Sequence, residues 1–222
     1  DMLRTPAVDE GDYLKRQVLV DELAKHPDCR KKFQKILRRL GKSREVRTDE
    51  LYNPTKFGMA LFAVSLFLLV AFVGCAVAAL FTKAAYMPLF LLLMINPIFH
   101  TSMLKKLERD LPTVNYSVGM VRAAHRLWKN STLAMQKELT VFGESVRQTK
   151  LLSQFSVVSV TATDDVISVL SLFFLFDIIS YGLTKGLLSK LNKDVFVLHE
   201  GVGLLDASIS ILSYRASLDG YT

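Results

Sequence analysis

The sequence has only two cysteines, Cys29 and Cys75, among its 222 residues, so no disulfide framework is available. A reducing compartment is therefore the simpler assumption for the chain. Its four histidines, His26, His100, His125 and His199, are scattered without the spacing of metal ligands. We interpret each of them as a surface or packed residue and predict no metal site.

Catalytic patterns are equally scarce. No nucleophile and base, no carboxylate pair and no glycine-rich phosphate loop stands out, and no Gly-Lys-Ser/Thr follows the short Gly201–Gly203 stretch. We therefore predict no catalytic residue and no cofactor-binding residue in these 222 positions. Alternation of apolar and polar residues is also missing over any useful length, which favours an all-α fold.

Charge is absent from two long neighbouring runs. Residues 57–81 and 84–103 carry no charged side chain, and only Thr82 and Lys83 separate them. A helix of about 25 residues extends about 37 Å, and a bilayer core is about 30 Å thick. The runs predict a two-helix transmembrane hairpin over residues 56–103. Gly74 and Ala78 have the spacing of a close helix contact, although facing lipid explains them equally well.

Basic residues crowd both outer ends of this hairpin, whereas its tip offers only Lys83. The positive-inside rule then predicts that both flanks of this multi-pass chain lie in the cytoplasm. The location we expect for it, the inner membrane, is what the resemblance described below implies. The basic flanking residues are Arg30, Lys31, Lys32, Lys35, Arg38, Arg39, Lys42, Arg44 and Arg47 before the hairpin and Lys105, Lys106 and Arg109 after it.

A third apolar run, residues 166–183, is interpreted differently. It is barely long enough to span and carries Asp177 near its middle, where a carboxylate in lipid costs about 2.5 to 3.5 kcal/mol. We expect a helix buried in protein. The alternative is a third span in a small transporter subunit, with Asp165 or Asp177 relaying protons.

The first soluble segment, residues 13–40, shows helical periodicity and predicts two amphipathic helices in series. Pro27 and Asp28 predict the break between them, with Asp28 as N-cap, and Gly41 predicts the end of the second helix. The second helix has a basic face that is a candidate contact for lipid head groups or nucleic acid, with plain solvation as the alternative. This candidate face consists of Arg30, Lys31, Lys32, Lys35, Arg38, Arg39 and Lys42.

Residues 104–152 and 192–217 are expected to be helical too, with Trp128 in a packing role. The fold prediction is an all-α helical bundle with an inserted transmembrane hairpin. Residues 1–55 would form its first part and residues 104–222 its second. The apolar residues expected to pack its core are Leu14, Leu19, Leu23, Phe33, Leu37, Leu205, Ile209 and Leu212.

The two ends of the chain carry a family resemblance. Residues 3–42 resemble a core-domain segment of the MutS family, in which a Leu-x-x-Pro turn precedes two helices. The matching positions are Leu3, Pro6, Asp9, Arg16, Val20, Leu23 and Pro27. Residues 204–222 are similar to the helix that ends the same core domain, with matches at Leu205, Asp206, Ala207, Ser208 and Tyr221.

The resemblance implies the core and lever region of a membrane-bound, MutS-related ATPase of the DNA mismatch-repair family. It implies an ATPase domain after Thr222, with ATP and Mg²⁺ as cofactors and a homodimer formed through that domain. DNA binding is a family expectation that the membrane hairpin puts in doubt. Asp206, at the start of the last helix, would cap it or pair with a basic residue. The competing hypothesis is a non-enzymatic, membrane-anchored helical adaptor that binds lipid head groups or a protein partner.

Overall fold

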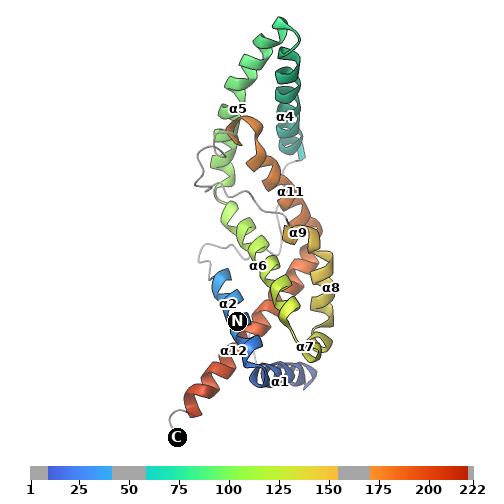
Figure 1. The fold of residues 1–222 in the computed structure, drawn as a ribbon, viewed down its shortest axis with the longest axis vertical. Coiled ribbons are helices and arrows are strands. Elements are labelled where there is room, and N and C mark those ends of the chain that lie inside the picture. The colour runs from blue at the N-terminus through green and yellow to red at the C-terminus, as the bar shows by residue number, and fades with distance from the viewer. Residues whose placement is uncertain (1–9, 42–58, 155–170, 220–222) are drawn as a thin grey trace. The chain divides into compact units, whose positions relative to one another are not determined.

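The computed structural model describes residues 10–41, 59–154 and 171–219, and every regular element in these ranges is a helix (Figure 1). The all-α prediction is therefore confirmed for the described chain. Leu3, Pro6, Lys42, Asp165 and Tyr221 lie outside it. The elements are α1 (Glu10–Lys25), α2 (Pro27–Leu40), α4 (Met59–Ala79), the 3-10 helix η1 (Lys83–Ala85), α5 (Tyr86–Leu107), α6 (Leu111–Asn130), α7 (Leu133–Glu138), α8 (Thr140–Gln148), α9 (Lys150–Gln154), α11 (Phe176–Lys190) and α12 (Asn192–Asp219).

The helices form two compact units. The bundle unit consists of α1, α2, α6 from Tyr116 onward, α7, α8, α9 and α12. The hairpin unit consists of α4, η1, α5, the first residues of α6 and α11. Three separate stretches of sequence thus build the bundle unit, and the hairpin is inserted between two of them.

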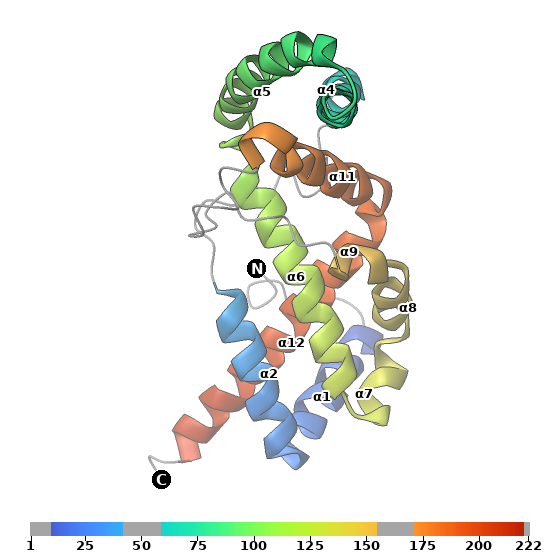
Figure 2. The same ribbon diagram turned by 45° about the horizontal axis from the view of Figure 1, so that its top comes forward.

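In the hairpin unit, α4 and α5 lie side by side and are joined by a sharp turn at Leu80–Thr82 and η1 (Figures 1 and 2). The second helix is longer than predicted, because α5 continues to Leu107 and includes Lys105 and Lys106 in its last turn. Pro97 lies inside α5 without ending it. Gly74 and Ala78 are exposed, and a Cβ added at Gly74 would meet no atom within 4 Å. Gly74 and Ala78 therefore face outward and do not form a close contact between α4 and α5.

Three helical segments of the described chain are long and apolar enough to cross a membrane, namely Ala60–Ala79, Lys83–Leu107 and Asn192–Leu218. The first two are the predicted hairpin. The share of the most apolar 18-residue window that is buried inside the protein is 11% in the first segment, 17% in the second and 44% in the third. The sequence prediction did not count the third segment, which is α12. Because α12 packs against α1, α2 and α8, we treat it as a helix of the bundle unit.

Within the described part of residues 166–183 and the helix that continues it, no segment is among the candidate membrane spans. Within the described part of this run, α11 has only 15 residues, and Asp177, Ile178 and Tyr181 on it are buried. Leu175, just before α11, is buried and has a left-handed φ of 54°, which interrupts the helix. Phe173 and Phe174 place their rings 6.4 and 5.4 Å from the ring of Phe72 on α4. The expectation of a helix buried in protein is confirmed for the described residues.

In the bundle unit, α1 and α2 occupy the predicted places, and Gly41 ends α2 with a φ of 69° and an N–H bond to the Leu37 carbonyl. Asp28 is not the N-cap that was predicted. Pro27 starts the helix, so the cap position falls to His26 and Asp28 lies in the first turn. Leu14 is 53% exposed and is not a core residue, because among the described residues the buried face of α1 is formed by Leu19, Val20 and Leu23.

The remaining predicted core residues pack as expected. Leu19, Leu23, Phe33, Leu205, Ile209 and Leu212 are buried, and Leu37 is half-buried. Helix α12 approaches α8 so closely that a Cβ on Gly201 would stand 2.2 Å from the Phe142 ring. Trp128 lies against Gly143 and against Phe142, 6.1 Å between ring centroids, which confirms its packing role.

Candidate functional site

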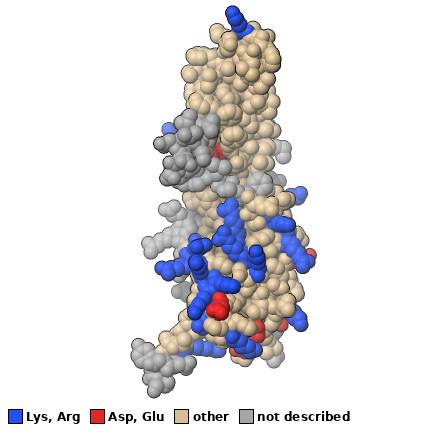
Figure 3. All heavy atoms as spheres, in the orientation of Figure 1, with Lys and Arg blue, Asp and Glu red and all other residues tan. Residues whose placement is uncertain are grey.

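The basic face of α2 lies where the sequence predicted it. Lys31, Lys32, Lys35, Arg38 and Arg39 are exposed, whereas Arg30 is half-buried. Within α2 and Gly41 these six basic residues accompany a single acidic one, Asp28. Figure 3 shows lysine and arginine side chains gathered where Figure 1 draws α2 and α6. The face therefore carries a concentrated positive charge.

Helix α6 adds to this charge. From Tyr116 to Asn130 it has three basic residues, Arg122, Arg126 and Lys129, and no acidic one. The two helices run side by side, because Cys29 near the start of α2 bonds to Asn130, and Leu40 at its end lies 3.7 Å from a Cβ added at Gly119. Positive charge is thus shared between two neighbouring helices.

A groove of about 660 Å³ opens beside α2, between α2, α6 and α12. Its apolar lining consists of Leu37, Leu40, Met120, Val202 and Ile209. Its polar lining consists of Gln34, Arg38, Tyr116, His199 and Asp206, and two glycines, Gly41 and Gly203, complete it. The site combines an aliphatic wall with a cation taken from the basic face.

Asp206 in this groove does not cap the last helix, which was the first of the two roles expected for it. Helix α12 begins at Asn192, so Asp206 is an interior residue of the helix and does not cap it. Burial, and then the negative charge of Asp206, raise the pKa of Tyr116 above its usual 10.0. The Tyr116 hydroxyl therefore stays protonated at neutral pH and can donate a hydrogen bond in the groove.

Two of the other positions that carry the resemblance, Leu23 and Leu205, lie in the core. Leu23 is fully buried and Leu205 is 1% exposed, so both belong to the core of the bundle unit. Arg16 on α1 is half-exposed. None of the three lines the groove.

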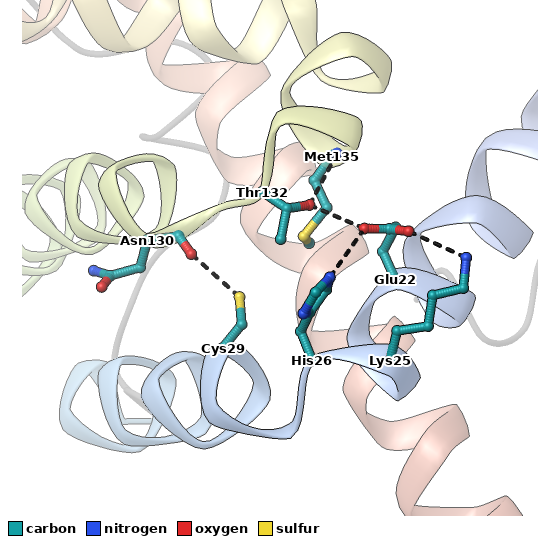
Figure 4. Close-up of polar contacts among 7 residues, drawn as sticks. All are labelled: Glu22, Lys25, His26, Cys29, Asn130, Thr132 and Met135. Atoms are coloured by element: carbon teal, nitrogen blue, oxygen red, sulfur yellow. Dashed lines mark hydrogen bonds and ion pairs between the residues drawn. The ribbon is translucent and has the colours of Figure 1, made fainter.

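A polar junction ties the α1–α2 corner to the α6–α7 corner (Figure 4). Thr132 caps α7 by accepting a bond from the Met135 N–H, and its hydroxyl donates to Glu22 at 3.2 Å. Cys29 donates its thiol to the Asn130 carbonyl at 3.2 Å. Burial raises the pKa of the Cys29 thiol, against the opposing charge of Lys32, so the thiolate needed for nucleophilic chemistry is disfavoured.

The hairpin unit contains a buried ionic cluster that the sequence reading missed. Lys185 Nζ lies 2.7 Å from Asp110 Oδ2 and 3.1 Å from the Tyr181 hydroxyl. Burial opposes the charge on Lys185, but the hydrogen bonds to Asp110 and Tyr181 prevail and raise its pKa above 10.5. Tyr181 and Lys185 are four residues apart on one helix face, a spacing visible in the sequence, whereas Asp110 is 75 residues away from Lys185.

A second buried pair lies on α5 and α11. His100 Nε2 is 3.6 Å from Asp177 Oδ2, and their side chains are 4% and 7% exposed. Asn96, one turn before His100, donates to the Phe173 carbonyl at 2.8 Å. Neither His100 nitrogen makes a hydrogen bond within the described residues, nor does Asn96 Oδ1. The carboxylate of Asp177 is thus buried in the hairpin unit beside His100.

Among the described residues, no group of three or more histidine, cysteine or acidic side chains is placed to hold a metal ion. No protein-family model, curated protein or solved structure matches the chain. The basic face of α2 and the adjoining groove are therefore the site that the structure itself offers.

Proposed function

We propose that this chain is the membrane-anchored core and lever region of a MutS-like ATPase. The observation that carries the proposal is the packing of the two stretches that bear the resemblance. Helices α1 and α2 belong to the first stretch, α12 ends in the last, and both α1 and α2 contact α12. The resemblance implies a core domain that is assembled from two stretches of sequence, one before and one after a long insertion.

The insertion takes the place of the family's lever and clamp. Between the two stretches the chain forms α4 and α5, whose outer surfaces are apolar and mostly exposed. In the proposed mechanism, ATP binding and hydrolysis in a flanking domain move the bundle unit, and the hairpin holds the moving part at the cytoplasmic side of the inner membrane. This protein's own residues supply packing and anchoring, while ATP and Mg²⁺ act in the flanking domain.

ATP hydrolysis by the complete gene product in membranes, with and without DNA, tests the proposal. Nucleotide hydrolysis that requires the complete protein supports a MutS-like machine, and stimulation by DNA adds duplex binding to its role. Absence of both nucleotide binding and hydrolysis contradicts the proposal. The chain would then be a membrane-anchored helical adaptor.

A further inference from the structure

The groove of the bundle unit has the lining of a site for an amphiphilic molecule. Leu37 and Leu40 from α2, Met120 from α6, and Val202 and Ile209 from α12 give it an aliphatic wall. Its volume of about 660 Å³ accommodates a substantial part of an acyl chain. Methylene groups that are buried on such a wall leave water, which favours the binding of an aliphatic chain.

The basic face of α2 lies beside the groove. Lys31, Lys35 and Arg38 follow one another at the four- and three-residue spacing of a single helix face, and Arg38 itself lines the groove. Two exposed basic residues on α6, Arg126 and Lys129, lie in the same unit. At physiological ionic strength, charges within about 8 Å still act together, so this face attracts anions.

Asp206 restricts where a ligand can carry its negative charge. Its carboxylate lines the same groove and disfavours an anion that is bound entirely within it. A molecule with its negative group at the Arg38 edge and an uncharged chain inside avoids this repulsion. The neutral Tyr116 hydroxyl adds a hydrogen-bond donor to the lining.

We propose that this groove binds one anionic phospholipid, with the phosphate on Lys31, Lys35 and Arg38 and an acyl chain against the aliphatic wall. The hairpin anchors the same chain in a bilayer, where phospholipid is the most abundant amphiphilic anion. The proposal depends on the hairpin and the groove but not on a flanking ATPase domain. Loss of ATP hydrolysis would therefore leave it intact.

The test is retention of phospholipid by the full chain. The chain is released from zwitterionic micelles that contain equal amounts of phosphatidylglycerol and phosphatidylcholine, and bound lipid is counted by native mass spectrometry. We expect one retained phosphatidylglycerol, favoured over phosphatidylcholine by about tenfold or more, because each nearby basic residue contributes about 1 kcal/mol.

Two variants address the two halves of the site. The triple reversal Lys31→Glu, Lys35→Glu and Arg38→Glu removes the charge preference. Gly203→Trp fills the groove, because Gly203 lines it and a Cβ there meets no atom within 4 Å. Both variants should lose the retained phosphatidylglycerol. If one of them misfolds, as judged by circular dichroism, the other still decides the question.

Matched controls separate this site from lipid around the hairpin. Lys137→Glu, Arg147→Glu and Lys150→Glu reverse three exposed charges elsewhere in the bundle unit, and Gly186→Trp adds an indole at another open, exposed glycine. Both controls should retain the lipid. Equal retention of the two phospholipids, or unchanged retention in both site variants, overturns the proposal. So does a triple reversal that abolishes binding of a DNA duplex while leaving lipid retention unchanged, since the face would then serve nucleic acid.

Discussion

At the scale of single residues, the Asp110–Lys185 pair shows how a charge is kept inside the hairpin unit. The side chains of Lys185 and Asp110 are 8% and 19% exposed, so the ammonium depends on this carboxylate and on Tyr181 for its hydrogen bonds. A buried charge without its partner costs far more than the pair itself contributes. Removal of one partner is therefore expected to destabilise the hairpin unit more than removal of both.

Asp110→Ala should lower the free energy of unfolding by about 1 to 3 kcal/mol, since it leaves Lys185 buried without its carboxylate. Adding Lys185→Met should recover most of this loss, because no buried charge then remains. Chemical unfolding of the chain in detergent micelles measures both effects. A double variant as unstable as Asp110→Ala alone would contradict this reading of the pair.

His125 gives the bundle unit a pH dependence. Burial lowers its pKa below the usual 6.5, opposed by hydrogen bonding to Thr149 and assisted by the charge of Lys150. A lowered folded-state pKa favours the neutral imidazole in the folded protein. Its stabilising contribution is therefore present above pH 6.5 and is lost as the pH falls through the lowered value.

The melting temperature should thus fall between pH 7 and pH 5, and His125→Gln should reduce that fall. His26→Gln, which removes the exposed imidazole 3.8 Å from the Glu22 carboxylate in the same unit, is the comparison and leaves the His125–Thr149 contact intact. Thermal unfolding at the two pH values measures the difference. An equal fall in the wild type and in His125→Gln would show that another group is responsible.

At the scale of elements, the crossing of α12 and α8 depends on a missing side chain. A Cβ at Gly201 would stand 2.2 Å from the ring of Phe142, which is itself 3% exposed and has little room to move. Gly203, two residues along the same helix, has open space instead. The two glycines therefore offer a matched comparison of packing with helix propensity.

Gly201→Ala should destabilise the bundle unit by about 1 to 3 kcal/mol, because overpacking outweighs the better helix propensity of alanine. Gly203→Ala should instead stabilise it by up to about 1 kcal/mol, since propensity acts there alone. Denaturant unfolding of both variants gives the comparison. Equal effects of the two substitutions would mean that α12 and α8 do not approach each other this closely.

Much of the element pattern could be predicted from the sequence, because it depends on local features. The uncharged runs predicted α4 and α5, and Pro27 and Gly41 predicted the ends of α2. Tertiary packing decided the rest. Periodicity placed Leu14 in the core, yet it is 53% exposed, and the buried residues of α1 that the structure describes are Leu19, Val20 and Leu23.

Only one of the two parts of the candidate site, the basic face of α2, could be predicted from the sequence. The residues of this face are close together in the sequence, so helical spacing was enough to identify them. The groove needs α2, α6 and α12 together, and the pairing of His100 with Asp177 joins residues 77 positions apart. Spacing alone gave no signal for such long-range contacts. His100 was interpreted as a surface or packed residue, and Asp177 was not predicted to be its neighbour.

At the scale of the whole molecule, the hairpin predicts a sidedness. A cysteine placed at the exposed Lys83, in a Cys29→Ser and Cys75→Ser background, should react with a membrane-impermeant maleimide added outside intact cells. Arg126→Cys, in the same background, should react only after the membrane is opened. Labelling of Arg126→Cys in intact cells would reverse the proposed orientation.

The central claim is that nucleotide moves the bundle unit relative to its membrane anchor. Spin labels on Lys83→Cys and Arg126→Cys, on two exposed positions of the hairpin unit and the bundle unit, report the distance between them in the complete gene product. The measurement is pulsed electron paramagnetic resonance in lipid nanodiscs, with and without a non-hydrolysable ATP analogue and Mg²⁺. A shifted distance distribution on nucleotide addition is the predicted result. An identical distribution at saturating analogue, whether it binds or not, would contradict the claim and leave a static membrane-anchored adaptor.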